Sequence, residues 1–558
     1  MRRAVLAGVV LAICTAFPAA AQVGPKRVAI VVIIDGSSLP DLLAVPQLRA
    51  LASRGGSALM NGRTPVRESL IPKLDLRDVR PLPLTNHGID LRGASPAEAA
   101  AAVRDFLADH PQPTLAMIVS ASPSAASAAD GDELGAVIAA WGDPDELLRA
   151  TGEPKALTSD STRRVGVVAT VDPAATVAEW LDLPYDAGAP IHPTDEPAPL
   201  DLYERYMQQR RLAVPVAATS WTVMGLAGVA GLLALRSRRR VSERTLAAAA
   251  ALVASLPWLA LALLLVGHLP SLTPWTVIPF LVLVTAVGVA LTRTVAARRG
   301  ILVAIAVAGA VILLALALEA FTGWTAAVTP LAGGGQLDGG RFFGMPNAEI
   351  GLVLGAGLYV AQRLRTAAGV ALLAVCALVT GSPWTGSNVG SAITLFATAG
   401  LWWGVRSRRR WWIVAIATTA ITTLGMVAVS VMHRYLTARP THVTAFLEQT
   451  TDVIGAIEHL VARLRIGLDL LAASPFSIVP VLGTIILLVV VLRPPAPVAA
   501  SFEARDRWRD AVFVILLGSV VAYLANDTGA AALGFGFGTA LSGLLDVSLT
   551  TAREKMTR

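Results

Sequence analysis

Cysteine and charged residues are both scarce in this chain of 558 residues. The two cysteines, Cys14 and Cys376, are too few for a disulfide framework or a cysteine metal site, so folds that depend on either are excluded. Only 15% of the residues are charged, whereas 54% are hydrophobic, and the mean hydropathy is +0.62. This balance excludes an ordinary soluble protein and indicates a polytopic membrane protein.

The net charge of +7 does not indicate a nucleic-acid partner, because many basic residues stand in short clusters directly after apolar runs. The sequence RSRRR occurs at 236–240 and again at 406–410. Clusters of this kind fix the orientation of membrane proteins, whose cytoplasmic connections carry an excess of Lys and Arg. We therefore expect membrane lipids as partners and no nucleic acid. The Ala- and Arg-rich, Lys-poor composition is typical of a high-GC bacterial source.

The N-terminus has the pattern of a secretory signal peptide. Arg2 and Arg3 precede a short apolar stretch at 5–17, and Ala19, Ala20 and Ala21 provide a cleavage site. An uncleaved first membrane anchor is the alternative. The predicted division of the chain is a signal peptide at 1–21, an extracytoplasmic domain at 22–210, a transmembrane helical domain at 211–550 and a cytoplasmic tail at 551–558.

The apolar runs after Arg211 predict about eleven spans, with about 20 residues taken as the length of a membrane helix. Alternate connections between these spans hold most of the basic residues, so we place those connections in the cytoplasm and the N-terminal domain outside the plasma membrane. The odd number of spans leaves the C-terminus in the cytoplasm. The predicted spans centre on 212–235, 245–266, 274–292, 301–319, 347–362, 367–381, 389–405, 411–432, 475–492, 511–525 and 528–547.

The segment from 23 to about 210 is predicted to be an α/β domain. The runs at 28–34, 115–120 and 165–170 indicate strands, and the first is continuously apolar, as in a buried parallel strand. Ser95-Pro96 followed by Glu98 predicts the start of a helix, and a second helix is expected at 172–183. Strands that alternate with helices favour a mostly parallel sheet.

Several motifs of this domain resemble the core of the alkaline phosphatase superfamily. VVIIDG at 31–36, LRALASRGG at 48–56 and LMNGRT at 59–64 are similar to the opening of that core, and the stretch at 161–191 is similar to its end. The resemblance implies that Asp35 binds a divalent metal ion and that Thr64 is the nucleophile of a phosphoryl transfer.

The domain departs from that family in its metal ligands and its length. The family has an Asp-His-Gly after a central strand, whereas the sequence here is SASPSAASAADG at 120–131. We therefore favour a truncated, non-catalytic relic that docks on the membrane part or recognises an anionic ligand, over a metal cofactor site. Asp35 is then a residue at the end of a strand, and Thr64 a loop residue.

Polar, glycine-rich stretches interrupt the apolar runs on one predicted face of the membrane. They are GGGQLDGGRFFGMPNAEIG at 333–351, GSPWTGSNVG at 381–390, an amphipathic outward segment at 433–475, and NDTG at 526–529. Irregular backbone is tolerated at membrane depth only where protein or water satisfies its polar groups. We therefore predict a ligand-binding cavity that opens outward and is lined by Asp338, Arg341, Asn347, Glu349, Asn388, Asn526 and Asp527.

Arg341 is the first candidate for an anion-binding residue, because a planar guanidinium suits phosphate or carboxylate. The free amides at the start of the following helix also favour an anion. A structural ion pair with Asp338 or Asp527 is the alternative. Glu319, near the end of an apolar run, is expected to reach the membrane interface, and a proton site is the alternative.

Three hypotheses about function follow. The first is binding or translocation of an anionic, lipid-linked precursor of the bacterial cell envelope, such as a lipid-linked glycan or a phospholipid. The second is a transferase of envelope glycans or head groups, with Arg341 on a phosphate and Asp527 or Glu349 as the base. The third is a metal-dependent phosphotransferase centred on Asp35 and Thr64. We rank the first above the second.

Overall fold

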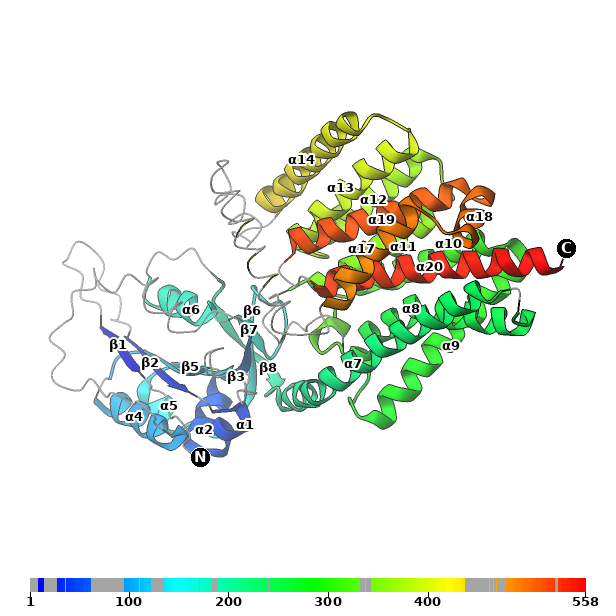
Figure 1. Ribbon diagram of the computed structural model, residues 1–558. Helices are drawn as coiled ribbons and strands as arrows, with labels where there is room; N and C mark the ends of the chain where they lie inside the picture. Colours follow the sequence, from blue (N-terminus) through cyan, green and yellow to red (C-terminus); the bar gives the residue numbers. More distant parts are fainter. Residues whose placement is uncertain are drawn as a thin grey trace. The chain divides into compact units, whose positions relative to one another are not determined.

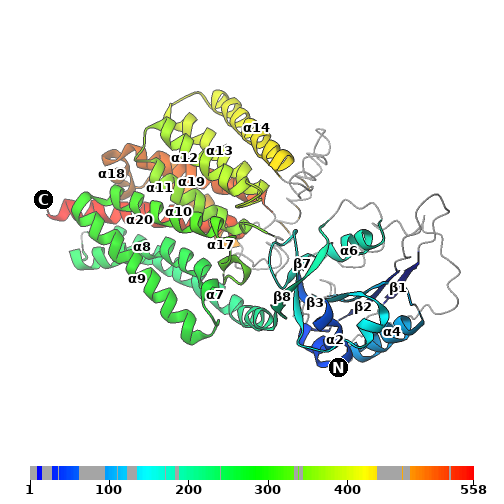
Figure 2. The ribbon, with the colours of Figure 1, turned by 180° about the vertical axis from the view of Figure 1, so that it is seen from behind.

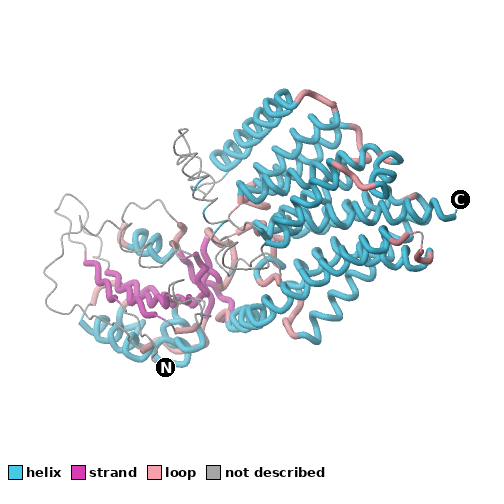
Figure 3. Tube along the Cα trace, in the orientation of Figure 1, coloured by secondary structure: helices cyan, strands magenta, loops and turns pink. Residues whose placement is uncertain are grey.

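The chain forms two compact units, Met1–Arg210 with Gln336–Phe343, and Arg211–Gly335 with Gly344–Arg558. In the part of the chain that the structure describes, strands occur only in the first unit, as Figure 3 shows in magenta. The computed structural model describes residues 9–14, 28–35, 37–61, 95–109, 111–121, 135–169, 171–182, 188–238, 240–331, 337, 343–436, 461, 465, 468, 478–526 and 530–557.

The first unit is built on an eight-stranded sheet with the order β1-β2-β4-β5-β3-β6-β8, and β7 pairs with β3 outside this path. The expected strands at 28–34, 115–120 and 165–170 are present as β2, β4 and β7. The strands are β1 Val9–Cys14, β2 Val28–Asp35, β3 Gly56–Asn61, β4 Thr114–Ala121, β5 Gly135–Gly142, β6 Lys155–Ser159, β7 Val167–Ala169 and β8 Ile191–Pro197.

The sheet is mixed, so the prediction of a mostly parallel sheet was wrong. β2 and β4 are parallel, and so are the pairs of β3 with β6 and β7, but β5 runs antiparallel to both β4 and β3. A continuous apolar run predicts that both faces of a strand are buried, and β2 is indeed covered on both sides. Burial does not determine the direction of the neighbouring strand, which explains the error.

β1 lies inside the stretch that we predicted to be a signal peptide. It pairs antiparallel with β2, with Val9 opposite Ile33 and Cys14 opposite Val28. The apolar residues that suit the core of a signal peptide also suit a strand, because both require a short hydrophobic run. Cleavage after Ala21 stays a prediction, and it would leave β2 at the edge of the sheet.

Helices cover both faces of the sheet (Figure 1). α6 Asp172–Trp180 packs on one face, where Val177 contacts the core that includes Val31 and Met117. The reverse view shows α2 and α4 together on the other face (Figure 2). The helices of that face are α1 Leu39–Ala44, α2 Pro46–Arg54, α4 Pro96–Asp109 and α5 Pro144–Leu148.

The predicted start of α4 is confirmed. The amide of Ser95 donates a hydrogen bond of 2.6 Å to Glu98 Oε2, and the amide of Glu98 donates one of 3.3 Å to Ser95 Oγ. These bonds satisfy amides that have no partner within the helix. They also lower the pKa of the Glu98 carboxyl below its ordinary value, because they favour the charged form.

The second unit is helical, and a helix occupies each of the eleven ranges that we predicted to be spans. A 3-10 turn, η5 Asn347–Glu349, precedes α11. The helices are α7 Leu200–Arg236, α8 Glu243–Leu265, α9 Pro274–Arg299, α10 Ile301–Phe321, α11 Ile350–Ala361, α12 Thr366–Gly381, α13 Val389–Arg406, α14 Trp411–Leu436, α17 Ile478–Leu492, α18 Ala496–Ala504, α19 Asp506–Ala525 and α20 Ala530–Thr557.

Seven helices of the described residues are long and apolar enough to cross a membrane, or eight if α17 and α18, bent by 66°, form one span. This finding indicates a polytopic membrane protein with fewer certain spans than we expected. The four predicted spans outside this set of seven are α11, α12, α13 and α17, which have 12, 16, 18 and 15 residues and are all shorter than about 20 residues, the length that spans the hydrocarbon.

α20 forms the centre of this unit. Most of its surface is buried against α8, α11, α17 and α19, whereas α9 and α14 leave most of theirs exposed. The exposed side chains of α9 and α14 are largely apolar, including Leu283 and Leu424, as suits helices that face lipid. The small residues of α20 permit the close packing: a Cβ on Gly536 would lie 1.9 Å from Ser519 Oγ of α19.

Candidate functional site

Two breaks in the helices of the second unit meet at one hydrogen bond between asparagines. Asn388 caps α13, because its Oδ1 accepts a 2.8 Å hydrogen bond from the amide of Ser391. Its Nδ2 donates to Asn347 Oδ1 at 2.9 Å and to the carbonyl of Met345 at 3.0 Å. The start of α13 is thereby joined to the turn that precedes α11.

Asn526 lies at the C-terminal end of α19 and approaches the same place. A Cβ on Gly390 would lie only 2.4 Å from Asn526 Oδ1, so α13 and Asn526 are in close contact. Asn526 Nδ2 donates to the carbonyl of Ala522 at 2.9 Å, and its buried Oδ1 accepts no hydrogen bond from the described residues. A buried acceptor without a donor is destabilising, which makes this atom a candidate for ligand contact.

Glu349 ends the turn η5, directly before α11. It is 1% exposed, and both of its carboxyl oxygens are buried without a hydrogen-bond partner among the described residues. The segment that follows Glu319 and the turn η5 both contact the loop before α13, because Trp324 Nε1 donates to the carbonyl of Thr385 and Asn388 Nδ2 donates to Asn347 Oδ1 at 2.9 Å. We call Asn347, Glu349, Asn388 and Asn526 the polar cluster.

The four residues of the polar cluster are all at most 5% exposed. In the described part of the structure, these side chains are therefore occluded and do not line an open cavity. The other three residues predicted for this site, Asp338, Arg341 and Asp527, lie outside the described residues. The prediction of ligand binding here stays a prediction.

Glu319, which we expected to reach the membrane interface, is enclosed by protein. It lies in the last turn of α10, is 4% exposed and forms an ion pair with His268 Nε2. Its second oxygen accepts a 3.1 Å hydrogen bond from the amide of Ala326. These two partners stabilise the carboxylate inside the protein, because they replace the hydrogen bonds that it would otherwise make to water. We did not single out His268 from the sequence, although a lone histidine at the end of an apolar run is a signal.

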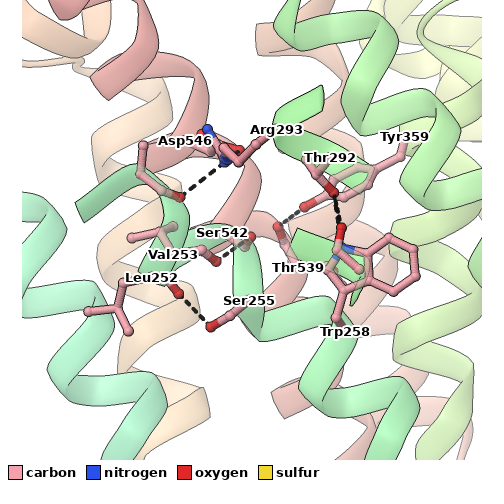
Figure 4. A network of polar contacts seen from close by, with 12 residues as sticks. Leu252, Val253, Ser255, Trp258, Thr292, Arg293, Tyr359, Thr539, Ser542 and Asp546 are labelled. Atoms are coloured by element: carbon pink, nitrogen blue, oxygen red, sulfur yellow. Dashed lines mark hydrogen bonds and ion pairs between the residues drawn. The ribbon is translucent and has the colours of Figure 1, made fainter. Parts of the chain in front are cut away.

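A second polar network links α8, α9 and α20 (Figure 4). Arg293 of α9 forms a 2.5 Å ion pair with Asp546 of α20, and it donates at 3.1 Å to the carbonyl of Ala250 in α8. Ser542 Oγ donates to the carbonyl of Val253 at 2.8 Å. From the sequence, we counted Arg293 only among the basic residues of the connections that we placed in the cytoplasm. Asp546 could have been predicted as a functional or pairing residue, because a single charged residue in an apolar span usually has a partner.

The predicted phosphatase site is described only in part. Asp35 is the last residue of β2 and stands in register with Ala121 of the parallel strand β4, and Thr64 lies outside the described residues. Ser37 and Ser120 are hydrogen-bonded beside it, with 3.2 Å between the Ser37 amide and Ser120 Oγ. Among the described residues, no group of three or more His, Cys, Asp or Glu side chains is arranged to hold a metal ion.

Comparison with known proteins finds no matching protein-family model, no matching curated protein and no matching solved structure. The resemblance of the first unit to the alkaline phosphatase superfamily therefore has no support beyond the motifs themselves. The function of the protein is therefore inferred from its own residues.

Proposed function

We propose that this protein binds or translocates an anionic, lipid-linked precursor of the bacterial cell envelope at the polar cluster of its helical unit. The observation that supports this proposal is the hydrogen bond between Asn347 and Asn388, which brings two helix breaks together inside an apolar unit. Membrane proteins build substrate sites from interrupted helices in this way, because only lined cavities tolerate such breaks.

The proposed topology has eleven spans in the plasma membrane, with the first unit outside and the C-terminus in the cytoplasm. The clusters at 236–240 and 406–410 support this orientation through the positive-inside rule. The short helices α11 and α12 would count as spans because they pack inside the unit, where protein and not lipid surrounds their ends. Residues 1–21 would be removed on export, which agrees with an external first unit.

An anionic ligand is favoured by groups at the breaks and by an arginine that is near them in sequence. The start of α11 offers helix N-terminal amides, which attract anions. Arg341, six residues before Asn347, supplies a guanidinium suited to a phosphate or a carboxylate. A lipid-linked phosphate combines a negative charge with an apolar tail that the surrounding helices can accept. The first unit would act as a non-catalytic docking module with Asp35 and Thr64 as a vestigial site.

Translocation is favoured over transfer because of the burial of Glu349. A general base must come within hydrogen-bonding reach of the group from which it takes a proton. Glu349 is 1% exposed in this occluded arrangement, so no reacting group lies within its reach, whereas a translocator is expected to pass through an occluded state. A transferase that uses Asp527 as its base is the second candidate, and turnover of a lipid-linked donor by purified protein in detergent would favour it.

Depletion of the protein in its native bacterium tests the proposal. We expect a lipid-linked envelope precursor to accumulate in the cytoplasmic leaflet, where mass spectrometry of lipid extracts and an impermeant probe of head groups will detect it. Accumulation on the outer leaflet would instead indicate a block in transfer. An unchanged lipid profile would contradict both functions.

Variants of Arg341 test whether its guanidinium group binds the anionic ligand. We expect Arg341→Ala to fail to restore growth and lipid profile in depleted cells, with affinity lowered by about 10- to 100-fold, because a charged hydrogen bond contributes about 1.5–3 kcal/mol. Arg341→Lys should restore function in part, since lysine keeps the charge without the planar fork. The control is Arg434→Ala, which removes an exposed arginine at the end of α14. Full function of Arg341→Ala at normal expression would contradict the assigned role.

A further inference from the structure

Glu349 is poorly suited to bind the anion that we propose as ligand. An ionised carboxylate would repel an anion, and burial without a partner costs an ion several kcal/mol. Both oxygens of Glu349 lack hydrogen-bond partners among the described residues. A carboxyl group in this position is stable when it carries a proton or when a cation lies beside it. Its environment therefore indicates a role other than direct contact with the ligand.

Glu349 is the innermost of three titratable side chains. The side chain of His268 is 46% exposed, and it forms an ion pair with Glu319, whose side chain is 5% exposed. Glu349 is 1% exposed and lies on the turn η5. Trp324 links Glu319 to the loop before α13, because its amide donates to the carbonyl of Glu319 at 2.7 Å and its Nε1 donates to the carbonyl of Thr385. The amide of Met345, four residues before Glu349, donates to the carbonyl of Gly386 in the same loop at 3.1 Å. We call His268, Glu319 and Glu349 the acidic row. The row leads from the exposed imidazole of His268 to the carboxyl group of Glu349, which belongs to the polar cluster.

The helices around the acidic row offer little competing charge. α20 packs against η5 and carries no charged side chain between Ala530 and Leu545. Asn388, at the start of α13, is neutral and uses its amide in the bonds to Asn347 and Met345. The electrostatic balance of Glu349 therefore depends, among the described residues, on its own protonation and on Glu319.

We propose that the acidic row carries protons between water and the polar cluster, and that it couples proton binding to binding of the anionic ligand. A protonated His268 gives its Nε2 proton to the Glu319 carboxylate and becomes neutral imidazole. Glu319 then gives a proton to the Glu349 carboxylate, directly or through a bridging water, and becomes ionised again. Neutral Glu349 removes the repulsion that an anion would meet. The coupling rests on the proposed function, whereas the proton path does not.

A proton suits this row better than a metal ion. Among the described residues, no group of His, Cys, Asp and Glu is arranged to hold a metal. Each ring nitrogen of an imidazole can carry a proton, which suits a group that receives a proton on one side and passes it on at the other.

Infrared spectroscopy of the full-length protein in lipid nanodiscs tests the proton path without knowledge of the ligand. We expect a protonated-carboxyl band at neutral pH that Glu349→Gln abolishes and Glu349→Asp shifts. After transfer to D2O, His268→Gln and Glu319→Gln should slow the deuteration of this band by about 100-fold, the lower end of what a positioned acid–base group contributes. Glu503→Gln, which alters an exposed carboxyl group on α18, should change neither.

Three results would overturn the inference. The first is a band that persists in Glu349→Gln or shows no shift in Glu349→Asp. The second is an unchanged rate of deuteration in both His268→Gln and Glu319→Gln. The third is loss of the band on addition of sodium at constant pH, which would assign the site to a metal cation. None of these results depends on the depletion experiment, so a failed proton path and a failed proposed function are distinguishable.

Discussion

Asp172 is the buried carboxylate that closes the core of the first unit. Its Oδ2 accepts hydrogen bonds from Ser159 Oγ at 2.5 Å and from the amide of Ala169 at 2.7 Å. Its Oδ1 accepts from Ser161 Oγ at 2.7 Å and from the amide of Ala189 at 3.0 Å. The side chain is fully buried, and each oxygen has one backbone amide that cannot turn away. A single residue thus joins β6, β7, α6 and the chain before β8.

We expect Asp172→Asn to destabilise the first unit by about 2 kcal/mol or more, because a buried donor left unsatisfied costs about 1–3 kcal/mol. The amide group of asparagine offers one acceptor oxygen, so its NH2 group must face one of the two backbone amides. The effect is measured by thermal unfolding of the full chain in detergent, with proteolysis of the first unit as the signal of unfolding.

The matched control for Asp172 is Asp195→Asn. Asp195 lies on β8 of the same unit, its side chain is fully exposed, and its partner is Lys155 at 2.9 Å. Water screens the charges of such an exposed pair, so this variant should unfold close to the wild-type temperature. Equal unfolding temperatures for Asp172→Asn and wild type would contradict the role of Asp172.

At the scale of elements, glycine determines how closely the broken helices approach. Gly351 of α11 lies so near α20 that a Cβ would stand 2.2 Å from the carbonyl of Ala532. A Cβ on Gly390 of α13 would stand 2.5 Å from the carbonyl of Ala525. Backbone atoms cannot move aside as a flexible side chain can, so these glycines are required for the packing of the polar cluster.

We expect Gly390→Ala to lower the stability of the helical unit by about 1–3 kcal/mol, the usual effect of overpacking. It should also separate Asn526 from the start of α13 and reduce function in the depletion assay. Thermal unfolding in detergent measures the first effect. The control is Gly225→Ala in α7, where a Cβ would meet nothing within 4 Å. A loss of stability as large at Gly225 as at Gly390 would contradict the explanation by close packing.

At the scale of the whole molecule, the chain divides into a unit with a mixed sheet and a unit of apolar helices. The charge distribution then predicts which side of the membrane each part occupies. The Lys and Arg residues gather in alternate connections of the helical unit, which predicts a cytoplasmic location for those connections. The same rule predicts that the first unit lies on the other side.

Labelling of single cysteines tests this orientation. In a background with Cys14 and Cys376 replaced by serine, we expect His192→Cys on β8 to react with a membrane-impermeant maleimide in spheroplasts. Ala504→Cys at the end of α18 should react only after lysis. Both positions are exposed, so accessibility and not burial decides the result. The reverse pattern, or labelling of both in spheroplasts, would contradict the predicted topology.

Local patterns were sufficient to predict many of the elements. The apolar run at 28–34 became β2, and Ser95-Pro96 with Glu98 became the start of α4, because capping and burial depend on neighbours in sequence. A helix also lies in each predicted span. The direction of β5, which made the sheet mixed, was not predictable from local pattern because it depends on long-range pairing.

The sequence by itself determined that the chain is a membrane protein with a separate α/β unit, since hydropathy and helix capping are properties of short segments. The tertiary structure alone decided that Glu319 pairs with His268, that Asn347 meets Asn388, and that Glu349 is buried without a hydrogen-bond partner among the residues that the structure describes. Those contacts join residues far apart in the chain. Their formation depends on how closely whole helices pack, which no local pattern specifies.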